Sequence, residues 1–370
     1  MPVTITLFIL AIATSTYVVF IILMYDGLKR ARIDASNENA LPPVSIIIAA
    51  RNEESNISHI LDDIIKQDYP KNLLHVFIAN DRSTDATPTI LRKYSAQYDF
   101  IHDIHIHQHS TEMAAKKNAL TQCIKHVKTE MILSCDADIR LGLNWVKAMV
   151  QGFTENTGVM TSYSSVTGNN LFARYQALDF LALQVSNGAM LNRGYNWSGT
   201  GQNIAYRKSA FIQIDGFRPS AHKDNDDDMY LIQTIPKQTG RDAKFNWNPE
   251  AMVQTHPTRD FKSFMNQRIR WASNSKGLEK SKPLFFIFLL SAYLTNLGIL
   301  MSLFFAPFSP VLWISILVKF LGEGAILLKG SSLMNERRLI MLFPLWFMIQ
   351  PLYISFMGIA GRIGKYSWKA

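Results

Sequence analysis

Cysteine is scarce in this 370-residue chain, which contains only Cys123 and Cys135. The two residues lack the spacing of a cysteine metal site. They also fall in a segment that we predict to be cytosolic, where disulfides are rare. We therefore expect both cysteines to be small buried residues. An internal repeat and a low-complexity tract are lacking as well, so the chain shows no sign of a repeat protein.

The chain has no interleaved basic and aromatic motif of the kind that indicates a nucleic-acid binder, although its formal net charge is +9. A basic balance can indicate nucleic acid. Here many of the lysines and arginines flank long apolar runs, where anionic lipid headgroups would attract them. We therefore predict membrane lipids as partners and no nucleic acid.

Residues 3–25 contain no charged residue, and a run of this length is sufficient to cross a hydrocarbon core of roughly 30 Å. A cleaved signal peptide is the alternative, but no basic residue precedes the run and its apolar core is too long. Lys29, Arg30 and Arg32 follow directly, and basic residues favour the cytosolic side of a membrane. We predict a transmembrane anchor over 1–27.

Three further apolar stretches lie near the C-terminus, at 284–305, 311–328 and 339–360. Lys319 and Glu323 fall inside the second stretch at a spacing of four residues, where they could pair within a helix bundle. Pro344 and Pro351 interrupt the last stretch, and whether it spans the membrane stays open. We predict a C-terminal membrane region over 283–361 with two to three transmembrane or re-entrant helices.

Between the membrane regions, residues 42–282 alternate between β-branched apolar runs and helical patterns. The run VSIIIAA is apolar on both faces, as a central parallel strand should be. Strands that alternate with helices imply right-handed βαβ units and a parallel sheet. We predict an α/β catalytic domain with a Rossmann-like, mostly parallel sheet, flanked by transmembrane helices. The expected strands are 44–50, 74–80, 101–107 and 131–137, and the expected helices are 55–67, 84–98 and 112–127.

Polar residues follow three of these strands directly. They are Arg51, Asn52, Glu53 and Glu54 after the first, Asn80, Asp81, Arg82 and Ser83 after the second, and Asp136 and Asp138 after the fourth. In parallel sheets, ligands bind outside the carboxyl ends of the strands. We therefore expect these polar side chains to converge on one crevice.

Asp136 and Asp138 have side chains on the same side of an extended segment, because alternate residues share a face. Burying two acids there is costly unless a cation or hydrogen bonds compensate them. Two carboxylates suit Mg²⁺ or Mn²⁺, whose coordination is completed by phosphate oxygens and water. An aspartate turn without a metal is the alternative, and we would favour it if the pair stood alone.

Two other segments have both an ordinary and a functional interpretation. In NDRSTDAT (80–87), Ser83 or Thr84 could cap the next helix, which leaves Asp81 to accept from a base or a ribose. Lys116 and Lys117 lie on a predicted helix, where a solvated face is the default and contact with a diphosphate is the alternative.

The segment 222–231 carries a dense group of acids, namely Asp224, Asp226, Asp227 and Asp228. Like charges raise carboxylate pKa values and favour a general base, whereas a solvated acidic run is the ordinary interpretation. Further along, Gln267, Arg270 and Trp271 share one face of a predicted helix. That helix could lie at the lipid interface, or Arg270 and Trp271 could contact phosphate and sugar.

In this order, SIIIAARNEE, NDRSTD, KKNAL, DAD, NDDD and QRIRW resemble the motifs of a family 2 glycosyltransferase with a GT-A fold. The resemblance covers roughly 44–275. Similar proteins are inverting enzymes that transfer a sugar from a nucleotide diphosphate, usually UDP, to an acceptor hydroxyl. The resemblance therefore implies a UDP-sugar donor, a lipid or glycan acceptor, and Mg²⁺ or Mn²⁺.

The resemblance also implies which residues bind the donor. Asp81 would contact the uracil or ribose, with Ala49 and Glu53 beside the nucleotide, and Lys116 would approach the diphosphate. Asn80 departs from the pattern, because many relatives have a second aspartate there, and this departure bears on base specificity.

The metal and the base follow from the same resemblance. Asp138, together with Asp136, would hold the metal that bridges the donor phosphates. Asp227, the second acid of the pair Asp226-Asp227, would be the base that deprotonates the acceptor. The remaining donor-binding element would be QxxRW, here Gln267, Arg270 and Trp271.

Several functions stay open from the sequence. One is transfer of a single sugar to a lipid or lipid-linked acceptor, and another is a processive polysaccharide synthase, which needs a channel. A membrane scaffold without catalytic activity is an alternative of a different class. We predict an integral protein of a bacterial inner membrane, with the domain 42–282 in the cytosol.

Overall fold

The computed structural model describes residues 2–31, 41–223, 226–275 and 277–363. Arg32, Asp224 and Asn225, which were considered above, lie outside the described residues. The chain splits into two compact units. The helical unit comprises Met1–Arg30, Gly168–Ala189 and Pro257–Ala370, and the α/β unit comprises Ala31–Thr167 and Met190–His256.

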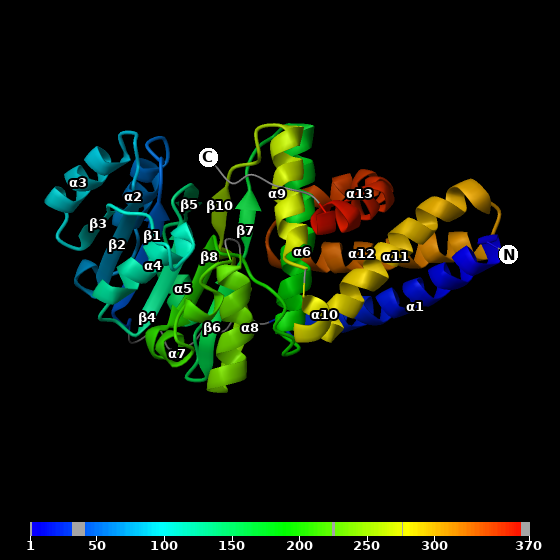
Figure 1. Ribbon diagram of the computed structural model, residues 1–370, viewed down its shortest axis with the longest axis horizontal. Helices are drawn as coiled ribbons and strands as arrows, with labels where there is room; N and C mark the ends of the chain where they lie inside the picture. The colour runs from blue at the N-terminus through cyan, green and yellow to red at the C-terminus, as the bar shows by residue number, and fades with distance from the viewer. Residues whose placement is uncertain (1, 32–40, 224–225, 276, 364–370) are drawn as a thin grey trace. The chain divides into compact units, whose positions relative to one another are not determined.

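The first half of the α/β unit alternates strands and helices (Figure 1). Its elements are β1 (Val44–Ala50), α2 (Ile57–Ile65), η1 (Lys71–Leu73), β2 (Leu74–Asp81), α3 (Thr87–Gln97), β3 (Ile101–Ile106), α4 (Ala115–His126), β4 (Met131–Asp136), β5 (Ile139–Leu141) and α5 (Trp145–Gln151). The later elements are β6 (Thr157–Ser162), β7 (Ser164–Val166), β8 (Asn203–Arg207), α7 (Lys208–Gln213), η2 (Arg218–Ser220), α8 (Asp227–Thr239), β9 (Asp242–Asn246), η3 (Pro249–Ala251) and β10 (Val253–Thr255).

The main sheet has the strand order β3-β2-β1-β4-β8-β6-β9, and a small sheet has the order β5-β10-β7. In the main sheet only β8 runs antiparallel to its neighbours β4 and β6. The register pairs Ala49 of β1 with Asp136 of β4, and Ala50 of β1 with Asn80 of β2. The carboxyl ends of these three strands therefore lie side by side, as the sequence predicts.

The core of this unit forms because the central strands are apolar on both faces. Ile46 and Ile48 of β1 are fully buried, as is Leu133 of β4. Against them pack Ile57, Ile60, Leu61 and Ile64, which recur at helical spacing on one face of α2. The predicted mostly parallel α/β fold is confirmed, and Cys123 and Cys135 are buried free thiols as expected.

The predicted cap of the helix after β2 is wrong. α3 begins at Thr87, and neither Ser83 nor Thr84 caps it. Instead, Asp85 accepts from the Thr87 backbone N–H at 3.0 Å, and the Ser83 hydroxyl accepts from the backbone N–H of Asn52. The loop after β2 is thereby tied to the loop after β1, a long-range contact that local capping preferences do not reveal.

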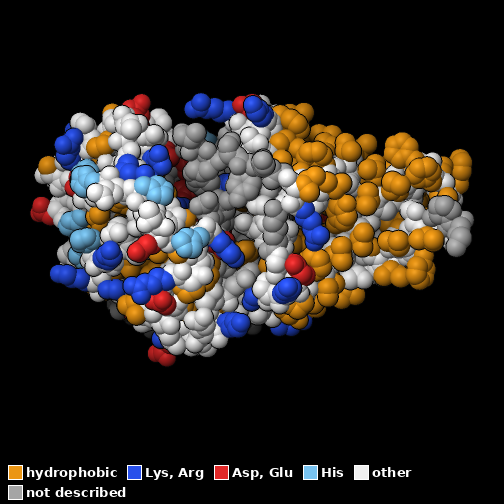
Figure 2. Space-filling view, viewed as in Figure 1, with side chains coloured by type: hydrophobic (Ala, Val, Ile, Leu, Met, Phe, Trp, Pro, Cys, Tyr) orange, Lys and Arg blue, Asp and Glu red, His pale blue; other side chains and the backbone are white. Residues whose placement is uncertain are grey.

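The helical unit contains α1 (Pro2–Lys29), α6 (Leu171–Leu191), α9 (Phe261–Ser273), α10 (Leu278–Ser281), α11 (Pro283–Phe305), α12 (Pro310–Leu333), η4 (Arg337–Leu342) and α13 (Phe343–Ile363). Among the described residues, four helical stretches are long and apolar enough to cross a membrane: Val3–Lys29, Pro283–Phe305, Pro310–Leu333 and Arg337–Ile363. Figure 2 shows hydrophobic side chains gathered over these helices.

The expected pair Lys319 and Glu323 forms inside the helical unit. Lys319 Nζ lies 2.9 Å from Glu323 Oε2, and the Tyr17 hydroxyl donates to Glu323 Oε1 at 2.7 Å. The same ammonium lies 4.3 Å from the centroid of the Phe347 ring. Because the pair is buried, these contacts compensate its charges and join α1, α12 and α13.

Besides the short α10, two longer helices from the predicted domain 42–282 belong to the helical unit. They are α6 and α9, which join by an ion pair between Asp179 Oδ2 and Arg268 Nε at 2.8 Å. The Trp346 indole of α13 donates to the other oxygen of Asp179 at 3.3 Å. The domain boundaries at 42 and 282 stay a prediction, while the contacts group α6 and α9 with the apolar helices.

We predict that Gly27→Ala lowers the melting temperature of the detergent-solubilised protein. A Cβ atom at Gly27 of α1 would lie 2.0 Å from the carbonyl oxygen of Ala189 in α6. Because relief would need a helix to shift, we expect a loss of about 1–3 kcal/mol in the free energy of unfolding. Gly142→Ala is the control, since a Cβ there meets nothing within 4 Å. An unchanged melting temperature for Gly27→Ala would contradict this helix contact.

Candidate active site

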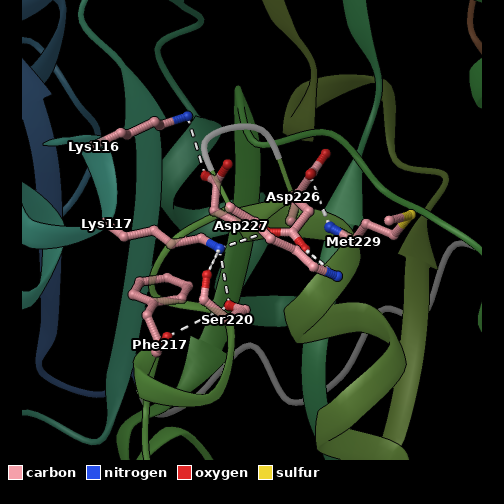
Figure 3. A network of polar contacts seen from close by, with 9 residues as sticks. Lys116, Lys117, Phe217, Ser220, Asp226, Asp227 and Met229 are labelled. Atoms are coloured by element: carbon pink, nitrogen blue, oxygen red, sulfur yellow. Dashed lines mark hydrogen bonds and ion pairs between the residues drawn. The ribbon is translucent and has the colours of Figure 1, made fainter. Parts of the chain in front are cut away.

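The Lys116 ammonium lies between acids that come from different parts of the α/β unit. Its Nζ is 2.9 Å from Asp136 Oδ1, at the end of β4, and 3.1 Å from Asp227 Oδ2, in the first turn of α8. Figure 3 shows Lys116 reaching from α4 toward Asp227. One cation therefore joins two carboxylates that are 91 positions apart in the sequence (227 − 136).

The charge on Lys116 is maintained by these acids. Burial acts to lower the pKa of the ammonium, but the charges of Asp136 and Asp227 outweigh burial and raise that pKa. The side chain is therefore a fixed cation at the carboxyl edge of the sheet. Such a cation attracts an anion such as a diphosphate.

The turn that carries Asp136 and Asp138 is held by a buried acid from α2. Asp63 accepts two hydrogen bonds from the Arg140 guanidinium, at 2.6 and 2.8 Å, and one from the Leu141 backbone N–H at 3.1 Å. These bonds hold Arg140 and Leu141 of β5, the strand that follows the turn after β4. Both Asp136 and Asp138 are part-exposed.

The donor set at this turn is small. Among the residues that the structure describes, no three His, Cys, Asp or Glu side chains are grouped so that they could hold a metal ion. A metal here would have Asp136 and Asp138 as its carboxylate ligands. Magnesium is commonly bound in this way, by one or two carboxylates together with substrate phosphates and water.

Asp81, the predicted nucleoside-binding acid, pairs with the next residue, Arg82. Both oxygens of Asp81 accept from the Arg82 guanidinium, at 2.8 and 3.1 Å. Arg82 has a φ of 53°, a left-handed conformation that turns its side chain back in this loop. A nucleoside at Asp81 would therefore meet an Asp–Arg pair rather than a lone carboxylate.

The other predicted donor residues lie at the ends of β1 and β2. Ala49 is part-exposed beside Asp136 in the register. Glu53 is buried, and its carboxylate accepts from the Asn56 amide at 2.8 Å. Asn80 is buried, and its side-chain amide lies 3.3 Å from Nδ1 of His105 on β3.

The three described acids before and within α8 have different surroundings. Asp226 is buried and pairs with the ammonium of Lys117. Asp227 pairs with Lys116, whereas Asp228 is part-buried and accepts from the Met229 N–H at 2.8 Å. Burial and the neighbouring Asp227 carboxylate raise the pKa of Asp228 to about 7.

Sequence reasoning distinguished neither Asp228 nor Lys117 here, whereas it expected the segment 199–208 to form a wall of the pocket. Asp228 was one of four acids within residues 224–228, and only the fold distinguishes it. Lys117 was expected on a solvated face, but its side chain is 1% exposed. Gly201 lies so close that a Cβ atom would be 3.2 Å from Asp227 Oδ2 and 3.3 Å from Lys116 Nζ. The glycine-rich sequence before β8 was the signal for Gly201.

Gln267, Arg270 and Trp271 lie on α9 of the helical unit, as the predicted helix requires. The Trp271 ring stacks on Phe180 of α6 at 5.2 Å between centroids. The guanidinium of Arg268 lies 4.1 Å from the Trp271 ring centroid and donates to Gln267 Oε1 at 3.0 Å. Gln267 and Trp271 of the motif therefore contact Arg268 of the same helix, and Trp271 also contacts α6.

A cavity of about 780 Å³ lies at the opposite edge of the main sheet. It is lined by residues at the amino ends of the parallel strands, including Pro43, His75 and Met131, and by Arg207 of β8. None of the predicted site residues lines it, so it does not belong to the candidate active site.

The chain matches the family model described as glycosyl transferase family 21 over residues 5–361. It is 24% identical over 376 residues to a probable glycosyltransferase, YdaM, of Bacillus subtilis, covering 90% of this chain and 87% of that protein. It is 32% identical over 116 residues to a beta-monoglucosyldiacylglycerol synthase of Nostoc, covering 31% of this chain and 24% of that protein.

Two further comparisons cover most of the chain. It is 24% identical over 299 residues to a poly-beta-1,6-N-acetyl-D-glucosamine synthase of Staphylococcus aureus, covering 77% of this chain and 66% of that protein. A solved mannosyltransferase from Pyrobaculum calidifontis, in complex with GDP-Man and Mn²⁺, has a TM-score of 0.62 and 20% identity. That match covers 97% of this chain and 99% of the mannosyltransferase, and it confirms the predicted GT-A fold.

We predict that Asp228→Asn stabilises the protein increasingly as the pH rises from about 4 to 7. The native carboxyl, with a pKa raised to about 7, keeps its proton in this window. The unfolded chain has already lost that proton, so ionisation of Asp228 lowers native stability as the pH rises. Thermal unfolding at pH 5 and pH 8 measures this difference.

The control is Asp99→Asn, which changes an exposed acid. The advantage of Asp228→Asn over wild type should grow between the two pH values and level off above pH 7. An advantage of equal size at pH 5 and pH 8 would contradict the raised pKa.

Proposed function

Because this chain belongs to glycosyl transferase family 21, we propose that it transfers a sugar from a nucleotide diphosphate sugar, a UDP-sugar by preference, to a hydroxyl of a membrane lipid or lipid-linked glycan, with inversion at the anomeric carbon. The glycosyltransferase class and the GT-A fold predicted from the sequence are confirmed. The finer assignment to family 2 is not supported, because the matching family is 21.

The observation that supports this proposal most is the position of the Lys116 ammonium between Asp136 and Asp227. An inverting transfer needs positive charge at the leaving diphosphate and a base at the acceptor, on opposite sides of the anomeric carbon. Asp136 belongs to the turn that we assign to the donor, and Asp227 to the segment that we assign to the acceptor. Lys116 brings the two together.

The proposed reaction forms one bond and breaks one. The acceptor oxygen bonds to the anomeric carbon, while the bond from that carbon to the donor phosphate oxygen breaks and its electron pair leaves with the nucleoside diphosphate. The acceptor proton moves to a carboxylate of the α8 segment. The Lys116 cation stabilises the charge that develops on the diphosphate. Mg²⁺ or Mn²⁺, held by Asp136 and Asp138, would neutralise further charge on that leaving group.

We assign the base to Asp228, in place of Asp227 as the resemblance implies. Asp227 forms an ion pair with Lys116 at 3.1 Å. Within the described part of the chain, Asp228 has no partner of opposite charge at ion-pair distance, and its pKa is raised to about 7. A base with a pKa near the working pH is the more efficient one. Asp226 is occupied by Lys117 and has no role in the proton transfer.

Donor and acceptor follow from different observations. The solved mannosyltransferase binds GDP-Man with Mn²⁺, which supports a nucleotide sugar and a divalent metal for this chain. The four helices among the described residues that are long and apolar enough to span a bilayer support an acceptor that resides in the membrane. The match to a monoglucosyldiacylglycerol synthase, over 31% of this chain, supports a lipid hydroxyl.

A processive polysaccharide synthase is the second candidate. It is favoured by the match to a poly-N-acetylglucosamine synthase over 77% of this chain. Single transfer is favoured because the four candidate spans in the described part of the chain are few for a polymer channel. For either function we place the protein in a bacterial inner membrane with the α/β unit in the cytosol, since Lys29 and Arg30 follow the first span.

We predict that Mn²⁺ together with one nucleotide sugar raises the melting temperature of the detergent-solubilised protein. The donors to test are UDP-glucose, UDP-N-acetylglucosamine and GDP-mannose. A ligand that binds only the native state stabilises it by mass action. Asp138→Asn should lose the metal-dependent part of the shift while it keeps the melting temperature of the free protein. No shift with any donor would favour the inactive scaffold, and an unchanged shift in Asp138→Asn would refute the metal ligand.

We predict that Asp228→Asn keeps the donor-induced thermal shift and lowers the rate of sugar transfer to membrane lipid by about 10²- to 10⁴-fold. Asp227→Asn should instead retain transfer and move the acid limb of the pH–rate profile to lower pH, because a charge that raises the pKa of Asp228 is gone. The reverse result, with transfer lost only in Asp227→Asn, would restore Asp227 as the base. The length of the labelled product separates single from processive transfer.

A further inference from the structure

Lys117 is a buried cation that the proposed reaction does not use. Its ammonium donates to the Ser220 carbonyl at 2.7 Å and to the Ser220 hydroxyl at 2.9 Å, and it pairs with Asp226. The rings of Phe217 and Tyr230 lie 6.0 and 5.9 Å from it. The close-up in Figure 3 shows Lys117 reaching Asp226 and Ser220 while Lys116 reaches Asp227.

Burying this cation is costly and therefore needs a reason. Its side chain is 1% exposed, and that of Asp226 is 8% exposed. Taking two charges out of water carries a large desolvation penalty, and an apolar pair of similar volume is often as stable. A buried ion pair therefore orients the segments that carry it more reliably than it stabilises the fold. Here the oriented segment is the start of α8.

The partners of Lys117 define where α8 begins. Ser220 is the last residue of η2, and Asp226 directly precedes Asp227, the first residue of α8. Asp226 uses no side-chain bond to cap the helix, because its carboxylate points to Lys117 instead. One ammonium thus ties η2 and the first turn of α8 to α4.

Adjacent residues of a helix point about 100° apart, so Lys116 and Lys117 reach different acids from one rigid backbone. Lys116 pairs with Asp136 and Asp227, and Lys117 pairs with Asp226. The consecutive acids 226 and 227 are therefore held by consecutive lysines. This leaves Asp228 as the next acid in the same turn.

We propose that Lys117 and Asp226 form a positioning pair, which orients the first turn of α8 so that Asp227 and Asp228 present their carboxylates at the reaction site beside Lys116. The inference rests on the proposed function for its effect on transfer. The pair touches neither donor nor acceptor. Its loss therefore lowers the rate of transfer through the acids that it orients and leaves donor binding intact.

The test compares three variants: Lys117→Met, Asp226→Leu and the double variant that carries both substitutions. Lys117→Met leaves the buried Asp226 with only the exposed Lys223, 3.6 Å away, and Asp226→Leu leaves the buried Lys117 without its acid, so each single variant should lower the melting temperature. The double variant removes both charges and replaces them with apolar groups, so its melting temperature should return toward that of wild type. Lys208→Met is the matched control, because Lys208 binds a backbone carbonyl, that of Val127, at the other edge of the sheet.

The decisive readout is transfer by the double variant in native-like membranes or detergent, with each of the three nucleotide sugars above and Mn²⁺. We expect an unchanged KM for the donor and a kcat about 10²-fold lower than wild type, since misplacement by about 1 Å can cost that factor. Lys208→Met should keep the wild-type kcat. A double variant with both the stability and the kcat of wild type would overturn the proposal, because the pair would then be only structural.

A second readout does not depend on activity. Backbone amide exchange over residues 227–231 should be faster in the double variant than in wild type, while exchange in β1 and β4 stays unchanged. Equal exchange of the α8 segment in both proteins would overturn the positioning role whether or not transfer is observed. Faster exchange in the double variant, together with a wild type that transfers no sugar, would instead count against the proposed function alone.

Discussion

The ammonium of Lys116 is the contact on which the candidate site depends. The fold brings together two carboxylates, one from β4 and one from α8, and removing them from water is unfavourable. The ion pairs with Lys116 offset this desolvation. Because β4 is central in the sheet and α4 packs on β1 and β2, this cation has a rigid support. A positive charge held in this way needs little reorganisation when charge develops on a leaving diphosphate.

The acids near α8 illustrate how one segment gives different chemistry to neighbouring residues. Asp226 is neutralised by a buried lysine, Asp227 by a part-exposed one, and Asp228 lies beside Asp227 with its pKa raised to about 7. In the proposed reaction, carboxylates with the same ordinary pKa thus take a structural, an electrostatic and a proton-accepting role. The environment of each acid, and not its type, makes the distinction.

The helical unit contains ion pairs of its own. Lys319, Glu323 and Tyr17 join three of the apolar helices, and Arg268 pairs with Asp179 where α9 meets α6. The second pair accounts for the packing of Gln267 and Trp271, which local spacing had only placed on one helix face. In both cases a buried ion pair selects which helices pack together, a use for which such pairs are better suited than for stability.

The sequence by itself determined the first four strands of the α/β unit, the helices between them and the edge of the sheet where the polar residues gather. Apolar runs and helical periodicity are local patterns, and the carboxyl ends of parallel strands must meet. The tertiary structure alone decided which side chains pair. Lys117 was expected to face solvent and is buried, Ser83 bonds the loop after β1 instead of capping α3, and Asp228 differs from Asp227. These outcomes depend on desolvation and on partners far away in the chain, and local sequence carries no record of either.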